Sequence, residues 1–130
     1  MRRFAFTVFL SALLAGCQES LEERAARDAR EFTETKCPMP IGGNMLLDSV
    51  VFDIPTLTQS QFFRVMGSLD NDSLFAQADS RSLLVAELRN APSYRPLMDR
   101  GVNFRYVYRS GLKPSHVLLE LTLTPDDYRR

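Results

Sequence analysis

The sequence predicts an α+β domain in which a four-stranded antiparallel sheet carries helices on one face. Three observations lead to this prediction: an amphipathic helical pattern near the amino terminus, two pairs of strand-forming segments, and a second helical region between the pairs. The predicted order is therefore α-β-β-α-β-β, with each pair of strands forming a hairpin. At 130 residues, 45% of them hydrophobic, the chain has the size and composition of one globular domain.

Charge and composition exclude several classes of function. The chain has 16 Lys and Arg residues against 16 Asp and Glu residues, so it lacks the basic excess that is typical of nucleic-acid binders. Two cysteines are too few for a disulfide-rich scaffold, and a single histidine leaves few ligands for the common zinc sites. We expect no nucleic-acid partner, no metal site and no cofactor.

The first sixteen residues have the pattern of a signal peptide. Arg2 and Arg3 precede an apolar run from Phe4 to Leu14. This run of about 11 residues is too short for a transmembrane helix, which needs roughly 20. We therefore expect residues 1–16 to be removed.

The residues that follow, Leu14-Ala15-Gly16-Cys17, resemble the lipobox of bacterial lipoproteins. The resemblance implies that the Cys17 thiol is lipidated, that the mature chain starts there, and that its acyl chains hold it on a membrane. An ordinary signal peptide with an unmodified Cys17 is the alternative. Gln18 is not the Asp that retains Gram-negative lipoproteins at the inner membrane, so the resemblance implies the periplasmic face of the outer membrane in the bacterial cell envelope.

A helix is predicted from Leu21 to Lys36. Ser20 followed by Glu23 has the spacing of a capping box, and Lys36 suits the last turn. The apolar residues recur at helical spacing and form one narrow stripe: Leu21, Ala25, Ala29 and Phe32. We expect residues 17–36 to be the lipidated cysteine and a surface helix, with a mobile tether as the alternative, and residues 37–130 to form the globular domain.

The first strand pair follows Pro38 and Pro40, which end the helix because neither has an amide donor. Strand-forming residues fill the segments from Met45 to Ile54 and from Gln61 to Ser68. The loop between them is short enough for an antiparallel hairpin. Its register is open, because neither segment alternates cleanly.

The second helical region starts at the cap residues 70–73 and continues through apolar residues at helical spacing up to Leu88. The pair Asp79-Ser80 is a candidate break between two helices. Pro92 and Pro96 interrupt the segment that follows. Gly101 is the expected terminating glycine.

The last two strands show the clearest alternation of apolar and polar residues, at 102–109 and 116–123. A loop from Ser110 to Ser115 aligns apolar with apolar and basic with acidic residues. The expected opposed pairs are Arg109 and His116, Tyr106 and Leu119, Phe104 and Leu121, and Arg105 and Glu120. The aromatic and leucine face should then meet the helices.

The other face of this hairpin is a candidate partner-binding surface, because it mixes charges with isolated aliphatic residues. Its members are Arg105, Val107, Arg109, His116, Leu118 and Glu120. The alternative is a solvated sheet face with ordinary ion pairs, each worth about 0–1 kcal/mol.

No catalytic constellation is predicted. A Cys37–His116 dyad lacks a nucleophile motif around it, so Cys37 is interpreted as a small core residue, with an intermolecular disulfide as the remaining alternative. The run Asp70-Asn71-Asp72 lacks the glycine and distal Glu of a calcium loop, and a helix cap explains it better.

Two functional hypotheses follow from these features. The favoured one is a non-enzymatic, lipid-anchored envelope protein, similar to small envelope lipoproteins of unknown function, that binds another protein or supports an assembly. The alternative is a small hydrolase or small-ligand carrier that uses a cleft between helix and sheet. The alternative predicts a deep pocket, whereas the favoured hypothesis predicts a filled core and a shallow outer face.

Overall fold

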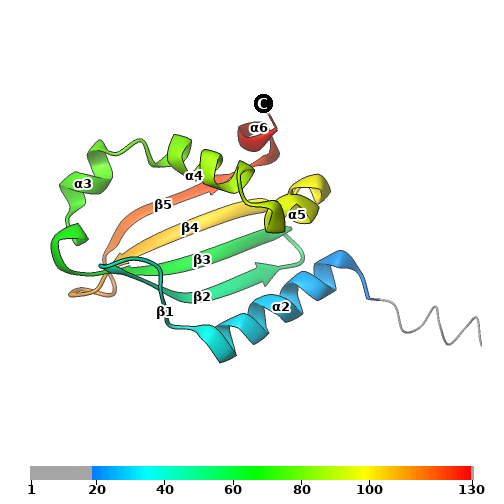
Figure 1. The fold of residues 1–130 in the computed structure, drawn as a ribbon, viewed down its shortest axis with the longest axis horizontal. Helices are drawn as coiled ribbons and strands as arrows, with labels where there is room; N and C mark the ends of the chain where they lie inside the picture. Colours follow the sequence, from blue (N-terminus) through cyan, green and yellow to red (C-terminus); the bar gives the residue numbers. More distant parts are fainter. Residues whose placement is uncertain (1–18, 130) are drawn as a thin grey trace, which may run out of the picture.

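A computed structural model describes residues 19–129 of the chain. The predicted signal peptide, Cys17 and Gln18 lie outside the described residues. Within the described part, the domain is an α+β structure with one sheet and helices that cover one of its faces (Figure 1).

The sheet has five strands in the order β1-β2-β3-β4-β5. Their bounds are Met39–Pro40, Met45–Asp53, Thr58–Val65, Asn103–Ser110 and Val117–Leu123. Neighbouring strands are antiparallel except for β3 and β4, which are parallel and make the sheet mixed.

The predicted four-stranded antiparallel sheet is therefore wrong in two respects. First, the helical region between β3 and β4 returns the chain to the opposite end of the sheet, so that β4 starts beside the start of β3. Such a crossover makes the two strands parallel. Second, Met39 and Pro40 pair with Leu47 and Leu46, because a proline that ends a helix is still tolerated in an edge strand.

The helices agree more closely with the sequence prediction. Helix α2 has the expected bounds, and the second helical region does divide at Asp79, whose side chain accepts a hydrogen bond from the Ser82 amide. The left-handed Gly101 ends α5 as expected. The helices and 3₁₀ turns are α2 (Leu21–Lys36), η1 (Gly67–Leu69), α3 (Asp72–Gln77), α4 (Ser80–Arg89), η2 (Pro92–Tyr94), α5 (Arg95–Arg100) and α6 (Pro125–Tyr128).

Strand β3 starts three residues earlier than predicted, because the connection from β2 is shorter than the predicted loop. The Asp53 carboxylate accepts a hydrogen bond from the Thr56 amide at 3.2 Å, and Leu57 takes a left-handed conformation with φ of 53°. The chain thus reverses before Thr58. Gln59 therefore belongs to the sheet rather than to the loop.

The hairpin of β4 and β5 has a register two residues away from the prediction. Tyr106 lies opposite Leu121 and not Leu119. A loop one residue shorter than predicted accounts for half of this shift, because the Ser110 amide donates to the His116 carbonyl at 3.0 Å. A bulge at Leu118 accounts for the other half. The shift of two keeps Leu119 to Leu123 on their predicted faces, whereas Leu118, predicted on the outer face, packs against the core at the bulge.

The apolar core lies between the sheet and the helices. The Phe63 and Tyr108 rings stack at 4.6 Å, and Phe104 meets Tyr128 edge-on at 5.8 Å. Tyr128 belongs to α6, which the sequence analysis did not predict, and its hydroxyl donates to the Val102 carbonyl at 2.9 Å. The C-terminal helix is therefore part of the core.

One side chain of helix α2, that of Thr33, forms hydrogen bonds with the edge of the sheet. Beyond the short strand β1, no strand among residues 19–129 pairs with the edge of β2, and Thr33 Oγ1 occupies that place. It accepts a hydrogen bond from the Val50 amide and donates one to the Val50 carbonyl, both at 2.9 Å. A side chain thus satisfies backbone groups that a strand edge would otherwise expose.

Candidate binding groove

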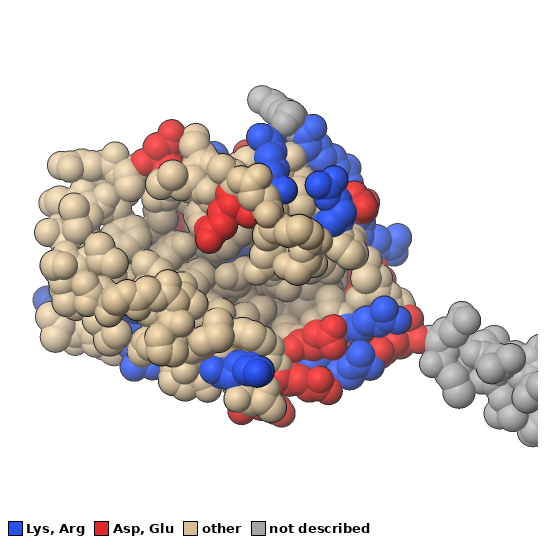
Figure 2. Space-filling view, viewed as in Figure 1, with Lys and Arg blue, Asp and Glu red and all other residues tan. Residues whose placement is uncertain are grey.

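A groove of about 940 Å³ runs between helix α2 and helices α4 and α5, with the sheet as its floor. Figure 2 shows the hollow from its open side, with α2 below it and α4 and α5 above it. Its size falls within the range of about 300–1,000 Å³ that is usual for ligand sites.

One wall is the apolar stripe of α2, the same four residues that the sequence analysis placed on one face of this helix. Two of the four, Ala25 and Ala29, have short side chains that do not reach the opposite wall. That wall carries Leu84 and Leu88 of α4 and Leu97 of α5. The groove stays open because α2 packs against β2, whereas α4 packs over β5.

The floor is formed by the helix-facing side chains of β2, β3 and β4, among them Leu47, Phe63 and Tyr108. Burial raises the pKa of Tyr108 to about 12, and it raises the pKa of Tyr106 further. Both phenols are therefore neutral at physiological pH. The floor offers aromatic surface with hydroxyl groups and no charge.

Few polar groups interrupt this lining. Gln61 Nε2 donates to the Tyr94 hydroxyl at 3.3 Å, and Gln59 Oε1 is buried with no hydrogen-bond partner among the residues that the structure describes. Charged residues lie on the walls: Arg24 and Asp28 on α2 and Glu87 on α4. An apolar groove with a few placed polar groups is the usual composition of a binding site.

The first turn of α2 is tied across to α5 by an ion pair between Glu22 and Arg100. The hydrogen bond from Arg100 lowers the pKa of the Glu22 carboxyl below its ordinary value of 4.5. The pair spans the space between the two walls near the start of α2. It therefore holds the walls together at the end of the groove closest to the amino terminus.

Four residues of the predicted partner-binding face lie on the opposite side of the sheet from the groove: Arg105, Val107, Arg109 and Glu120. Arg105 Nε pairs with Glu120 at 3.2 Å, and its guanidinium lies over the Phe62 ring at 5.6 Å. Because of the register shift, Glu120 is directly opposite Val107, which is fully buried. Only part of the predicted surface is therefore open to a partner.

The remaining members of that face lie near the end of the β4–β5 hairpin. Arg109 donates to the Pro114 carbonyl at 3.5 Å, and Leu118 is the bulge residue, which packs against the core. The His116 ring contacts the Asp72 carboxylate at 2.8 Å. Whether this face binds a partner stays a prediction.

No arrangement in the described residues favours nucleophilic chemistry. Burial, with a smaller contribution from Asp48, raises the pKa of the Cys37 thiol, which disfavours the thiolate. His116 is engaged with Asp72 rather than with Cys37. Among residues 19–129, no cluster of His, Cys, Asp and Glu could hold a metal ion, and no helix is long and apolar enough to cross a membrane.

The sequence pattern predicts the α2 wall of the groove but not the opposite wall or the floor. The narrow apolar stripe of α2 predicts a surface helix, whereas in the structure it forms one side of the groove. The sequence prediction places Gln59 in a loop, whereas it lies in β3 on the floor of the groove. The alternation of Gln59, Gln61 and Phe63 is the signal that could have placed polar groups on the helix-covered face.

Fold and groove together define a class of small α+β domain in which two helical walls leave a mixed sheet open between them. The chain belongs to the family described as "Domain of unknown function (DUF8479)", which matches residues 20–119. No curated protein matches the sequence.

Solved structures share this fold at low sequence identity. A protein of Pseudomonas aeruginosa described as secreted has a TM-score of 0.65 at 16% identity, over 86% of this chain and 100% of that one. The pilotin EpsS of the Vibrio vulnificus type 2 secretion system has a TM-score of 0.59 at 14% identity, over 85% and 93%. The type II secretion system pilotin AspS of Vibrio cholerae has a TM-score of 0.59 at 17% identity, over 88% and 97%.

Proposed function

We propose that this protein is a non-enzymatic, lipid-anchored component of the bacterial envelope that binds a segment of a protein partner in its groove. The observation that carries the proposal is the open apolar groove of about 940 Å³ between α2 and α4–α5. Two solved structures with this fold are pilotins of type II secretion systems, which supports a role in a secretion assembly. The anchor at Cys17 and its place at the outer membrane are the predictions from the lipobox.

The shape of the groove favours a helical segment of the partner. Its wall on α2 extends from Leu21 to Phe32, which is roughly 17 Å at 1.5 Å per residue, or about three turns of a helix lying alongside. The strands of the floor already have partners on both sides, except at the edge of β2. An added strand therefore has no place in the groove, whereas a helix can insert its apolar face between the two walls.

Charge adds a further expectation about this helix. Asp28 and Glu87 lie on opposite walls, and Arg24 is the one basic residue of the described chain that lines the groove. Carboxylates on both sides favour a partner helix whose apolar stripe is flanked by Lys or Arg. We propose an amphipathic helix with basic flanks as the occupant.

A small-ligand carrier, the alternative hypothesis, would use the same groove, and the volume of the groove is compatible with it. The hydrolase alternative has less support, because the pKa of the Cys37 thiol is raised and His116 is bound to Asp72. The opposite face of the sheet, with Arg105 and Glu120, stays a proposal for a second contact surface.

Site-specific photocrosslinking in the host cell separates the two surfaces. A photoreactive residue placed at Ala25 or Glu87 samples opposite walls of the groove, and one at Val51 or Glu120 samples the other face of the sheet. We expect both groove positions to capture the same protein, and mass spectrometry to place the crosslink in a segment with apolar residues at helical spacing and basic flanks. Crosslinks from Glu120 with none from the groove would contradict the proposal.

A further inference from the structure

We propose that the groove also holds an acyl chain attached at Cys17 while the protein is outside the membrane, and releases it when the chain inserts into the bilayer. This inference rests on the lipid anchor of the proposed function. The acyl chain and the partner helix would then compete for one site. Partner binding would begin only after anchoring.

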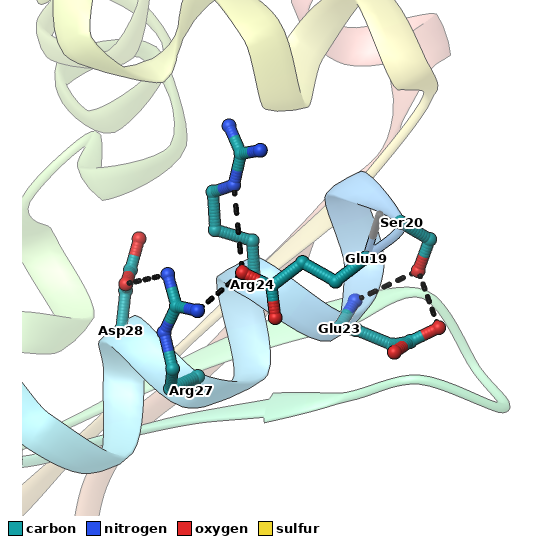
Figure 3. A network of polar contacts seen from close by, with 6 residues as sticks. All are labelled: Glu19, Ser20, Glu23, Arg24, Arg27 and Asp28. Atoms are coloured by element: carbon teal, nitrogen blue, oxygen red, sulfur yellow. Dashed lines mark hydrogen bonds and ion pairs between the residues drawn. The ribbon is translucent and has the colours of Figure 1, made fainter. Parts of the chain in front are cut away.

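The first described residue contacts the start of α2, which forms one wall of the groove. Glu19 precedes α2, and its carboxylate pairs with Arg24 at 3.8 Å and with Arg27, as Figure 3 shows. The side chain of Glu19, the first described residue, is thus held against the first turns of α2. Arg24 is itself a lining residue of the groove.

The attachment point is close to this end of the groove. Cys17 precedes Glu19 by two residues, so their Cα atoms are at most about 7 Å apart in a fully extended chain. Leu21, four residues after Cys17, already lines the groove. An acyl chain on the Cys17 sulfur therefore starts within reach of the apolar lining and needs no rearrangement of the fold to enter it.

The chemistry of the lining suits a hydrocarbon chain. Acyl chains need no hydrogen bonds, and the neutral aromatic floor and the short side chains of Ala25 and Ala29 leave apolar space along α2. A flexible chain can also follow an irregular groove that a rigid ligand would fill incompletely. Since exposed methylene groups are unfavourable in water, a lipoprotein that leaves one membrane for another gains from covering its own lipid.

The inference is tested with the lipidated mature protein purified from membranes and transferred to detergent-free buffer. The probe is cis-parinaric acid, a fatty acid that fluoresces in apolar sites, and the comparison protein is the unlipidated Cys17→Ser variant. We expect the variant to bind the probe saturably at one site, and the lipidated protein to bind it at least tenfold more weakly because its own chain occupies the groove. Equal binding by the two proteins would overturn the inference.

Matched variants control for the position of the lipid. Ala25→Phe fills the groove, and Val51→Phe adds the same ring on the other face of the sheet. In the Cys17→Ser background, Ala25→Phe should remove probe binding and Val51→Phe should not. In the lipidated protein, Ala25→Phe should expel the acyl chain and cause self-association on gel filtration, whereas Val51→Phe should leave a monomer; circular dichroism checks that both are folded.

The two proposals fail separately. If the lipidated protein binds the probe as well as Cys17→Ser does, or if a folded Ala25→Phe variant stays monomeric with its lipid attached, the acyl chain does not occupy the groove. Crosslinking of a partner helix at Ala25 and Glu87 would still support the proposed function. If mass spectrometry finds no lipid on Cys17, the inference falls together with the anchor.

Discussion

Replacing Thr33 by Val should loosen helix α2 from the edge of β2 and lower the free energy of unfolding. Valine has nearly the same shape, so the change removes the two hydrogen bonds of Thr33 Oγ1 to Val50 and little else. The amide and carbonyl of Val50 then lose their partner at an edge that no strand of the described part of the chain covers. The same change loosens one wall of the groove.

The expected cost follows from these two bonds. A hydrogen bond contributes about 0.5–1.5 kcal/mol net, and more when a buried partner is left unsatisfied. Val50 is only half-buried, so water can replace part of the loss. We expect a decrease of about 1–2 kcal/mol, which corresponds to a shift of roughly 0.5–1.5 M in the midpoint of urea unfolding.

Urea unfolding followed by circular dichroism at 222 nm is the suitable assay, because the sequence has no Trp. Thr35→Val is the matched control, since its hydroxyl donates only to the Glu31 carbonyl within the same exposed turn at 2.6 Å. It should change the stability by less than about 0.5 kcal/mol. If Thr33→Val is as stable as Thr35→Val, the hydroxyl does not fasten α2 to the sheet.

Three further predictions concern the core, the end of the groove and its floor. Tyr128→Phe leaves the Val102 carbonyl without its buried donor, and it should lower the free energy of unfolding by about 1–2 kcal/mol in the same urea assay. An unchanged midpoint would show that this hydrogen bond of α6 does not stabilise the core. The Glu22 carboxyl should titrate with a pKa below 4.5 by NMR, so its contribution to stability is present above its unfolded pKa and is lost as the pH falls through its folded pKa. Arg100→Gln should return this pKa to the ordinary range, and an unaltered titration curve would exclude the ion pair. The Tyr108 phenol should ionise only near pH 12 by ultraviolet titration. The stability that this group contributes is present below its unfolded pKa of about 10 and is lost as the pH rises through its folded pKa; normal ionisation near pH 10 would mean that the Tyr108 hydroxyl is not buried.

Local features of the fold could be predicted from the sequence, because their causes lie within a few residues. The Glu23 amide donates to Ser20 Oγ at 3.1 Å, as the capping-box spacing predicts. Gly101 ends α5 in the left-handed conformation that glycine adopts most readily. The alternation also predicts the observed faces of β4 and of Leu119 to Leu123 in β5, whereas Leu118 at the bulge departs from it.

Features that depend on distant parts of the chain could not be predicted in this way. The direction of β4 relative to β3 is set by the path of the helices between them, and no pattern in either strand encodes it. The register of β4 and β5 depends on a bulge at Leu118, which looks like an ordinary strand residue in the sequence. The alternation of apolar and polar residues predicts which face of the sheet a side chain lies on, whereas loop and bulge geometry determines which residues pair across two strands.

The groove belongs to this second group. The sequence shows that Ala25 and Ala29 share one face of a helix, but the distance from α2 to α4 follows from the packing of each helix on a different part of the sheet. Its boundaries on α4 and α5 therefore need the tertiary structure. The face with Arg105 and Glu120 can be predicted from the sequence because both residues belong to a single hairpin.

Methyl chemical-shift mapping with the partner segment tests the occupation of the groove most directly. The segment identified by crosslinking is added as a peptide to protein with labelled Ala, Leu and Val methyl groups. Methyl signals of Ala25, Leu88 and Leu97 should shift on binding, while those of Val51 and the exposed Leu112 should stay in place. Shifts confined to Val51 or to the β4–β5 hairpin, with the groove signals unchanged, would contradict the account.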